Sequence, residues 1–195
     1  VPRLSSIGRQ AAEQAAAAIQ RSDLVIRIGV ARAKLQQALG RRSDALQTVE
    51  RALAAANSLN DAALLARTHQ TALQLYAWTG PATKAREHGA LAIALARESG
   101  DRQIEWAAHW AMGMLEGLSG DGHSMSPHLH AAAALADSLG SPLLQAMTAE
   151  LEIEHASGVG NWTQALAVAE RTIPLARAVM PKSLLPRLLV WTGMI

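Results

Sequence analysis

The stretch Asp23–Asp61, DLVIRIGVARAKLQQALGRRSDALQTVERALAAANSLND, decides the fold, and its centre is Gly40. We interpret it as two helices joined by a turn at that glycine. Glycine then returns every 40 residues along the chain, at Gly80, Gly120 and Gly160. A fixed period of this length indicates one helical hairpin repeated in tandem, and such a repeat determines the architecture.

Other residues keep a constant distance from these glycines. Sixteen positions after each glycine stand alanines, at Ala56, Ala96, Ala136 and Ala176. Sixteen positions before each glycine, and before the next position of the series, stand aliphatic residues: Leu24, Leu64, Ile104, Leu144 and Leu184. A second column, five positions before the glycines, holds Leu35, Leu75, Leu115 and then His155. Because small residues let helices approach closely and aliphatic residues fill the space between repeats, we expect these columns to be buried.

The composition favours helices throughout. Hydrophobic residues make up 50% of the chain, Phe is absent and aromatic residues total 3%. Alanine supplies much of the hydrophobic content, and it is the strongest helix former. We therefore predict an all-α fold, a right-handed α-solenoid of antiparallel helix pairs with about ten helices.

The composition also excludes several classes of protein. The chain has no Cys, which removes disulfides and thiolate metal sites. No apolar run approaches the roughly 18 residues of a membrane span, so we expect a cytoplasmic protein without membrane contact. The net charge is +2 and the longest basic run is Arg41-Arg42, so we expect no direct binding of nucleic acid.

We divide the chain into four full repeats between two half repeats. The full repeats are 23–61, 62–101, 102–141 and 142–181, and the halves are 1–22 and 182–195. Since the chain begins and ends inside repeats, we expect it to be a fragment of a longer solenoid.

Two helix boundaries are predicted from capping residues. Separate helices are expected at 3–20 and 23–39, because Ser22 or Asp23 could cap the second one. After Gly120 the next helix is expected to begin late, near Ser126.

Two segments resemble a known repeat family. Gly40–Ala45, followed by Val49 and Ala52, is similar to the turn and second helix of a tetratricopeptide repeat. Gly160–Ala165 matches better, with Trp162 at the position that an aromatic residue usually holds. The family's period is about 34 residues, so both helices are longer here.

The long period and the joints between repeats resemble one subgroup of that family. These joints are Ser58–Asp61, Glu98–Asp101 and Ser138–Ser141. Similar arrays form the sensor regions of large bacterial transcriptional regulators of the maltotriose-responsive activator type, which join an ATPase module to a helix-turn-helix domain. The resemblance implies a cytoplasmic signalling protein with an attached ATPase, or a cyclase in related arrays.

A candidate binding groove follows from the expected curvature. The first helix of each pair lines the concave face of a solenoid, and the residues opposite the Leu24/Leu35 stripe would face it. These residues are Arg27, Lys34, Arg67, Gln70, Gln74, Trp78, Trp110, Met114, Glu150 and Glu154. They place an apolar anchor between a basic and an acidic end, so we predict that a protein segment or a small effector binds there. The alternative is that the polar residues only face solvent and Trp110 packs between helices.

The histidines suggest structure rather than a metal site. His123, His128 and His130 cluster in sequence, but their spacing does not put two ligands one helical turn apart. We therefore predict no metal, and a metal-dependent enzyme on this turn stays an open alternative. His69 and His109 are 40 residues apart, and we expect them to pair on neighbouring helices.

No catalytic signature is present. The sequence has no Gly-x-Ser-x-Gly elbow, no phosphate loop and no dinucleotide fingerprint, so we predict no catalytic residue, no cofactor and no enzyme. Glu150 and Glu154 are one turn apart, which is typical of a solvated acidic face. A different class of function, self-association, stays open, because terminal half repeats could stack and bury Leu184, Leu185 and Trp191.

Overall fold

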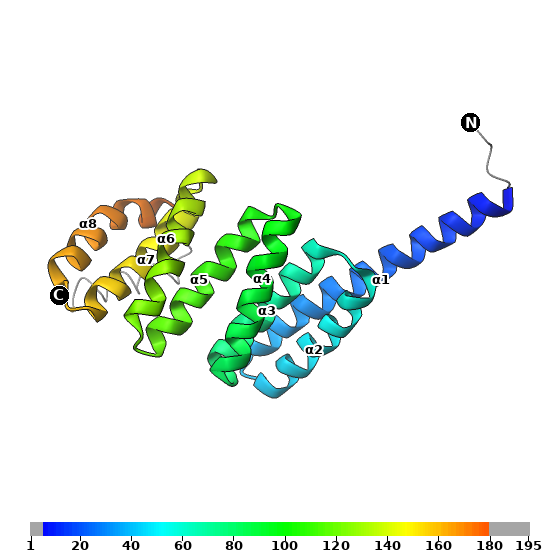
Figure 1. Cartoon of the computed structure of the whole chain (residues 1–195), viewed down its shortest axis with the longest axis horizontal. Helices are drawn as coiled ribbons and strands as arrows, with labels where there is room; N and C mark the ends of the chain where they lie inside the picture. The colour runs from blue at the N-terminus through cyan, green and yellow to red at the C-terminus, as the bar shows by residue number, and fades with distance from the viewer. Residues whose placement is uncertain (1–5, 180–195) are drawn as a thin grey trace. The chain divides into compact units, whose positions relative to one another are not determined.

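The computed structural model describes residues 6–179, and within this range the chain forms eight helices and no strand (Figure 1). The helices are α1 (Ser6–Ala38), α2 (Arg42–Leu59), α3 (Ala62–Thr79), α4 (Ala82–Ser99), α5 (Arg102–Leu118), α6 (Gly122–Ser138), α7 (Pro142–Gly158) and α8 (Trp162–Val179). They pack as successive pairs, α1–α2, α3–α4, α5–α6 and α7–α8. The predicted α-solenoid of helix pairs is therefore confirmed.

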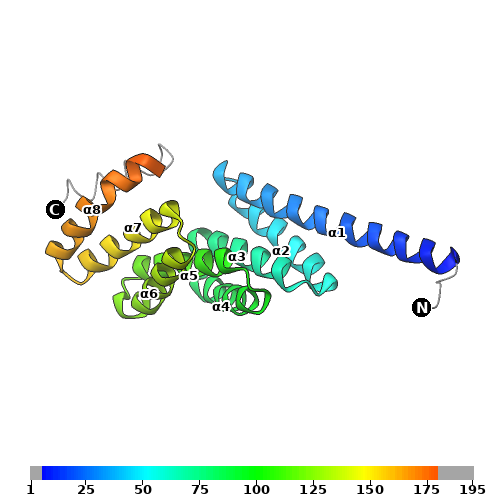
Figure 2. The same ribbon diagram turned by 90° about the horizontal axis from the view of Figure 1, so that it is seen from above.

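The chain divides into two compact units, Val1–Ser99 and Gly100–Ile195, here called unit 1 and unit 2. Unit 1 contains α1–α4, and unit 2 contains α5–α8 (Figures 1 and 2). In unit 1, α3 packs against α2 and also touches α1; in unit 2, α7 packs in the same way against α6 and α5. Each unit thus repeats one arrangement of two helix pairs.

Left-handed backbone recurs at the turns between helices. Positive φ angles occur at Gly40, Asn60, Gly100, Gly120, Gly140 and Gly160. Glycine, and to a lesser degree Asn, adopts this conformation at low cost, and it ends a helix. Gly80 differs, with φ −128° and ψ −172°, because Pro81 pushes the preceding residue into the extended region.

One predicted helix boundary is wrong, because 3–20 and 23–39 do not form two helices. α1 runs without a break from Ser6 to Ala38. The position that holds Asn60, Gly100 and Gly140 in later repeats holds Gln20 here, which has no preference for left-handed backbone. Ser22 does not cap a helix either, since its hydroxyl donates to the Ala18 carbonyl oxygen at 3.0 Å within α1. The last expected helix, after 182, lies outside the described residues.

The start of α6 also differs from the prediction. The helix begins at Gly122 and not near Ser126. The Asp121 carboxylate accepts a hydrogen bond from the Ser124 backbone N–H at 3.0 Å, which satisfies one of the unpaired N–H groups of the first turn. Asp61 and Asp101 cap α3 and α5 in the same way.

The core consists of the predicted columns in most repeats. The column of Ala56, Ala96, Ala136 and Ala176 is at most 1% exposed, and Leu64, Leu75, Leu115 and Leu144 are also buried. Leu24 and Leu35 are exceptions, with 58% and 59% exposure, so the prediction that they are buried is wrong. α1 packs toward α2 and α3 through Ile26, and this orientation leaves its leucine face outward. Across residues 6–179, no helix is long and apolar enough to span a bilayer.

Candidate functional site

The ten residues predicted to line one groove divide between the two units, with six in unit 1 and four in unit 2. In unit 1, Arg27, Lys34, Arg67 and Trp78 are exposed, whereas Gln70 is only 4% exposed. Partial burial lowers the pKa of Lys34, and the neighbouring charge of Arg67 lowers it further. The structure therefore brings Lys34 of α1 and Arg67 of α3 together. Gln74 is half-buried on the same helix as Arg67.

In unit 2, two of the four predicted residues do not lie on the surface. Met114 is 6% exposed and packs with Met125 and Leu151, and Glu150 is 2% exposed. The spacing put Met114 of α5 and Glu150 of α7 on the open face of their helices, but α7 packs against α5, and Leu151 of α7 lies in the same cluster as Met114. Trp110 is half-buried, and its indole N–H donates to the Met147 carbonyl oxygen at 3.0 Å. Met114 and Glu150, which were predicted to line the groove, are therefore buried.

Glu154, the fourth residue, lines a pocket of about 490 Å³ in unit 2. The pocket lies where the α5–α6 turn meets the α7–α8 turn, and glycines form much of its wall. Its main side chains are His123, Met125, Glu154, His155, Val159 and Trp162. Pockets for small ligands measure roughly 300–1,000 Å³, so this one could hold a single side chain of a partner or a small molecule.

The wall of this pocket depends on the absence of side chains at its glycines. A Cβ at Gly117 would lie 3.1 Å from Glu154 Oε1 and 3.3 Å from Met125 Sδ. A Cβ at Gly122 would lie 3.3 Å from a methyl group of Val159. Glycine at these positions therefore keeps the two turns close and leaves the space open.

The chemistry of the pocket suits a cation. The Glu154 carboxylate lines it, and the Trp162 indole is 52% exposed at its edge. Aromatic faces attract ammonium and guanidinium groups, and a carboxylate adds a formal charge. The lining residues include no Lys and no Arg to oppose such a ligand.

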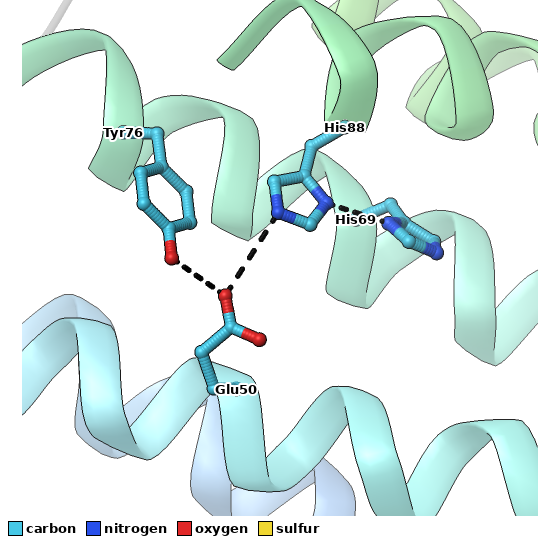
Figure 3. Close-up of polar contacts among 4 residues, drawn as sticks. All are labelled: Glu50, His69, Tyr76 and His88. Atoms are coloured by element: carbon cyan, nitrogen blue, oxygen red, sulfur yellow. Dashed lines mark hydrogen bonds and ion pairs between the residues drawn. The ribbon is translucent and has the colours of Figure 1, made fainter. Parts of the chain in front are cut away.

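A second polar cluster joins three helices of unit 1 (Figure 3). The Tyr76 hydroxyl of α3 donates to Glu50 Oε1 of α2 at 2.7 Å. Nε2 of His88, on α4, lies 3.9 Å from the same oxygen. The Nδ1 atoms of His88 and His69 are 3.0 Å apart, so one ring donates its N–H and the other accepts.

Burial keeps this cluster uncharged apart from Glu50. It lowers the pKa of His69 to about 4, with a further contribution from His88 that outweighs the attraction of Glu50. Burial also lowers the pKa of His88, although Glu50 and Glu87 act in the opposite direction. Burial first, and then the hydrogen bond to Glu50, raises the pKa of Tyr76 to about 12. Neutral imidazoles and a neutral phenol hold the helices together here and offer no activated nucleophile.

The histidine pair repeats in unit 2. The Nδ1 atoms of His109 and His128 are also 3.0 Å apart. Glu116, at the position of Tyr76 forty residues earlier, is 4% exposed and raises the pKa of His128, while burial lowers it more. The predicted pairing of His69 with His109 is wrong. Each instead pairs with a histidine 19 residues later, because those two positions face each other across one helix pair.

The histidines near 123–130 do not gather around a metal. His123 and His130 are exposed, and His128 turns to His109. Among the described residues, no group of three or more His, Asp or Glu side chains has a geometry that could hold a metal ion. His155 is half-buried and lines the pocket of unit 2.

Comparison with known proteins supports the fold alone. No protein-family model matches the chain, and no curated protein matches it. Among solved structures, it is similar to the crystal structure of BtubC (BKLC) from P. vanneervenii, with a TM-score of 0.78 and 18% sequence identity. The match covers 95% of this chain and 77% of that one. The helical repeat fold is thus shared with a protein of very different sequence.

The pocket of unit 2 and the Glu50 cluster were not predicted from the sequence. A signal for the pocket existed in the unusual number of glycines between Gly117 and Gly122 and again between Gly158 and Gly160. A signal for the cluster was the recurrence of histidine at 88 and 128, in step with 69 and 109. Neither signal identifies the contacts, because these depend on how helices pack.

Proposed function

We propose that the chain is a non-catalytic helical-repeat scaffold that binds a segment of a partner protein. The observation that carries the proposal is the pocket of unit 2, in which Glu154 and Trp162 face a space large enough for one side chain. Helical-repeat proteins commonly act as binding scaffolds. A lysine or arginine of the partner segment suits the pocket, because its charge would meet a carboxylate and an aromatic face.

Two finer statements belong to the same proposal. The resemblance to tetratricopeptide arrays favours a sensor region of a bacterial transcriptional regulator, located in the cytoplasm, with binding passed on to an attached ATPase or cyclase. The exposed basic side chains of Lys34 and Arg67 would supply further contacts to the partner or effector. Activity measurements on the chain joined to such a module, with and without bound partner, would test this step.

The pocket can be tested with three short peptides that differ only in a central Arg, Lys or citrulline. Citrulline keeps the shape of arginine and lacks its charge. We expect saturable binding of the Arg and Lys peptides in calorimetry, and about three- to tenfold weaker binding by Trp162→Ala or Glu154→Gln. Trp78→Ala is the matched control, because that indole is equally exposed and lies outside the pocket.

Two results would contradict the proposal. Equal affinity for the citrulline peptide would show that the pocket does not select a cation. The same loss in Trp78→Ala as in Trp162→Ala would move the binding surface to unit 1.

A further inference from the structure

An open groove of about 250 Å³ lies between α1 and α2 in unit 1. It is lined by Val25, Ile28 and Arg32 of α1 and by Thr48, Arg51 and Ala55 of α2. Leu24, Ile28 and Leu35 of α1 are each more than half exposed. At the spacing of a helix these three residues fall on one side, so they form an apolar stripe next to the groove.

Two buried polar atoms in this helix pair lack a partner. Within the described part of the chain, Gln36 Oε1 and Thr48 Oγ1 have no hydrogen bond, although the residues are only 6% and 7% exposed. Thr48 also lines the groove. A buried polar group without a partner is costly, and nearly all such groups in native proteins are paired. Thr48 therefore offers an unsatisfied hydroxyl to an occupant of the groove, and Gln36 is a second such polar group in the same helix pair.

The next helix pair shows which chemical group contacts the residues equivalent to Gln36 and Thr48. Tyr76 and His88 stand forty residues after Gln36 and Thr48, at the same places in the repeat. There Glu50, from the neighbouring helix α2, accepts the hydrogen bond of Tyr76 at 2.7 Å and lies 3.9 Å from His88. In the covered pair, a carboxylate from an adjacent helix thus meets both residues.

The charges around the open groove favour the same kind of group. Arg32 of α1 and Arg51 of α2 line the groove. An acidic occupant would be attracted by both. The Thr48 hydroxyl can donate to a carboxylate, and the Gln36 amide can do so after a half turn about its last bond.

We propose that this groove docks an amphipathic helix of a partner protein, which presents a glutamate or aspartate to Thr48 and Gln36. The apolar side of that helix covers Leu24, Ile28 and Leu35, and its flanking acids pair with Arg32 and Arg51. This binding mode is helix-in-groove recognition. The site is separate from the pocket of unit 2 and does not depend on it.

The probe is a peptide with the sequence of α2, residues 42–59, cross-linked to hold it helical and labelled for fluorescence anisotropy. This helix carries Glu50 and already packs against the equivalent face of α3. We expect saturable binding to the full chain. Glu50→Gln in the peptide, or Ile28→Asp in the protein, should weaken the binding of the peptide about tenfold or more. Trp162→Ala should leave it unchanged, which separates this site from the proposed pocket.

Three results would overturn the proposal. The first is no saturable binding of the glutamate peptide, and the second is equal binding of the Glu50→Gln peptide. The third concerns a second copy of the chain, because Glu170 of α8 stands at the place of Glu50 in the repeat and is exposed. If light scattering shows dimers that Glu170→Ala dissociates, the groove belongs to another copy and not to a separate partner.

Discussion

The α1–α2 and α3–α4 pairs of unit 1 follow the same repeat but differ in what covers them. In α3–α4, the face that receives α2 is closed, with Thr68 and Ala72 fully buried. In α1–α2, the equivalent residues Ile28 and Arg32 are exposed and line a groove. The same face of the repeat is thus covered by a neighbouring helix in α3–α4 and open in α1–α2.

The polar residues of the two pairs differ in the same way. Glu50 completes a hydrogen-bond cluster with Tyr76 and His88 in the second pair. The equivalent Gln36 and Thr48 keep buried atoms without partners among the described residues. Four experiments test whether the two pairs differ in this way.

The largest expected effect comes from exchanging equivalent residues. Ala72 is fully buried, and the equivalent residue of the first pair is Arg32. Ala72→Arg therefore puts an arginine at a buried position. We expect it to lower the free energy of unfolding by about 3 kcal/mol or more, because the charge has no partner there. Arg32→Ala, the converse change, should stay within about 0.5 kcal/mol. Urea denaturation followed by circular dichroism measures the free energy of unfolding of both variants. Equal losses would show that positions 32 and 72 do not differ in how they are covered.

Acid should weaken the second pair before the first. The pKa of His69 is about 4 in the folded protein, below the ordinary histidine value of 6.5, so the unfolded chain takes up the proton first as the pH falls. Stability is therefore complete above pH 6.5 and is lost toward pH 4, by up to about 3 kcal/mol for this residue. The lowered pKa of His88 acts in the same direction.

Hydrogen exchange of the α3 and α4 amides between pH 7 and pH 5 would follow this loss. The double variant His69→Leu, His88→Leu should flatten the pH dependence, and His123→Ala, which alters an exposed histidine, should not. The first pair carries Gly29 and Thr48 at the two histidine positions. An equal loss of stability at low pH in α1 and α2 would contradict the assignment of this effect to His69 and His88.

The third change should have opposite signs in the two pairs. Tyr76→Phe removes the hydrogen bond to Glu50 and should cost about 1 kcal/mol. Gln36→Leu removes a buried oxygen without a partner and should stabilise the unbound chain by about 1 kcal/mol. Thermal denaturation of both variants gives the signs. A loss of stability in Gln36→Leu would mean that this oxygen is satisfied.

The smallest effect concerns the joints. Gln20→Gly should cost about 0.5–1 kcal/mol of local helix stability, because glycine is unfavourable inside a helix. Asn60→Gly should change stability by only a few tenths of a kcal/mol, since Asn60 already has a φ of 51°. Hydrogen-exchange rates of the amides that follow each substituted residue measure these local stabilities. If Gln20→Gly does not accelerate exchange, α1 is not continuous at this position.

Much of the fold followed from local patterns in the sequence. The period of the glycines, the alanine columns and the capping aspartates are properties of neighbouring residues, and each acts through a turn or a helix terminus. Gln20 shows the limit of such reasoning. A capping residue at Asp23 suggested a break, but without a residue suited to left-handed backbone the helix continued.

The sequence by itself determined that this chain forms paired helices with a period of 40 residues, because helix propensity and turn chemistry are local. Only the tertiary structure decided which faces are covered. Helical spacing put Met114, Glu150 and Trp78 on comparable faces, yet helix packing buried the first two in unit 2 and left Trp78 exposed in unit 1. It likewise joined His69 to His88, since contacts between helices depend on where each helix lies in space.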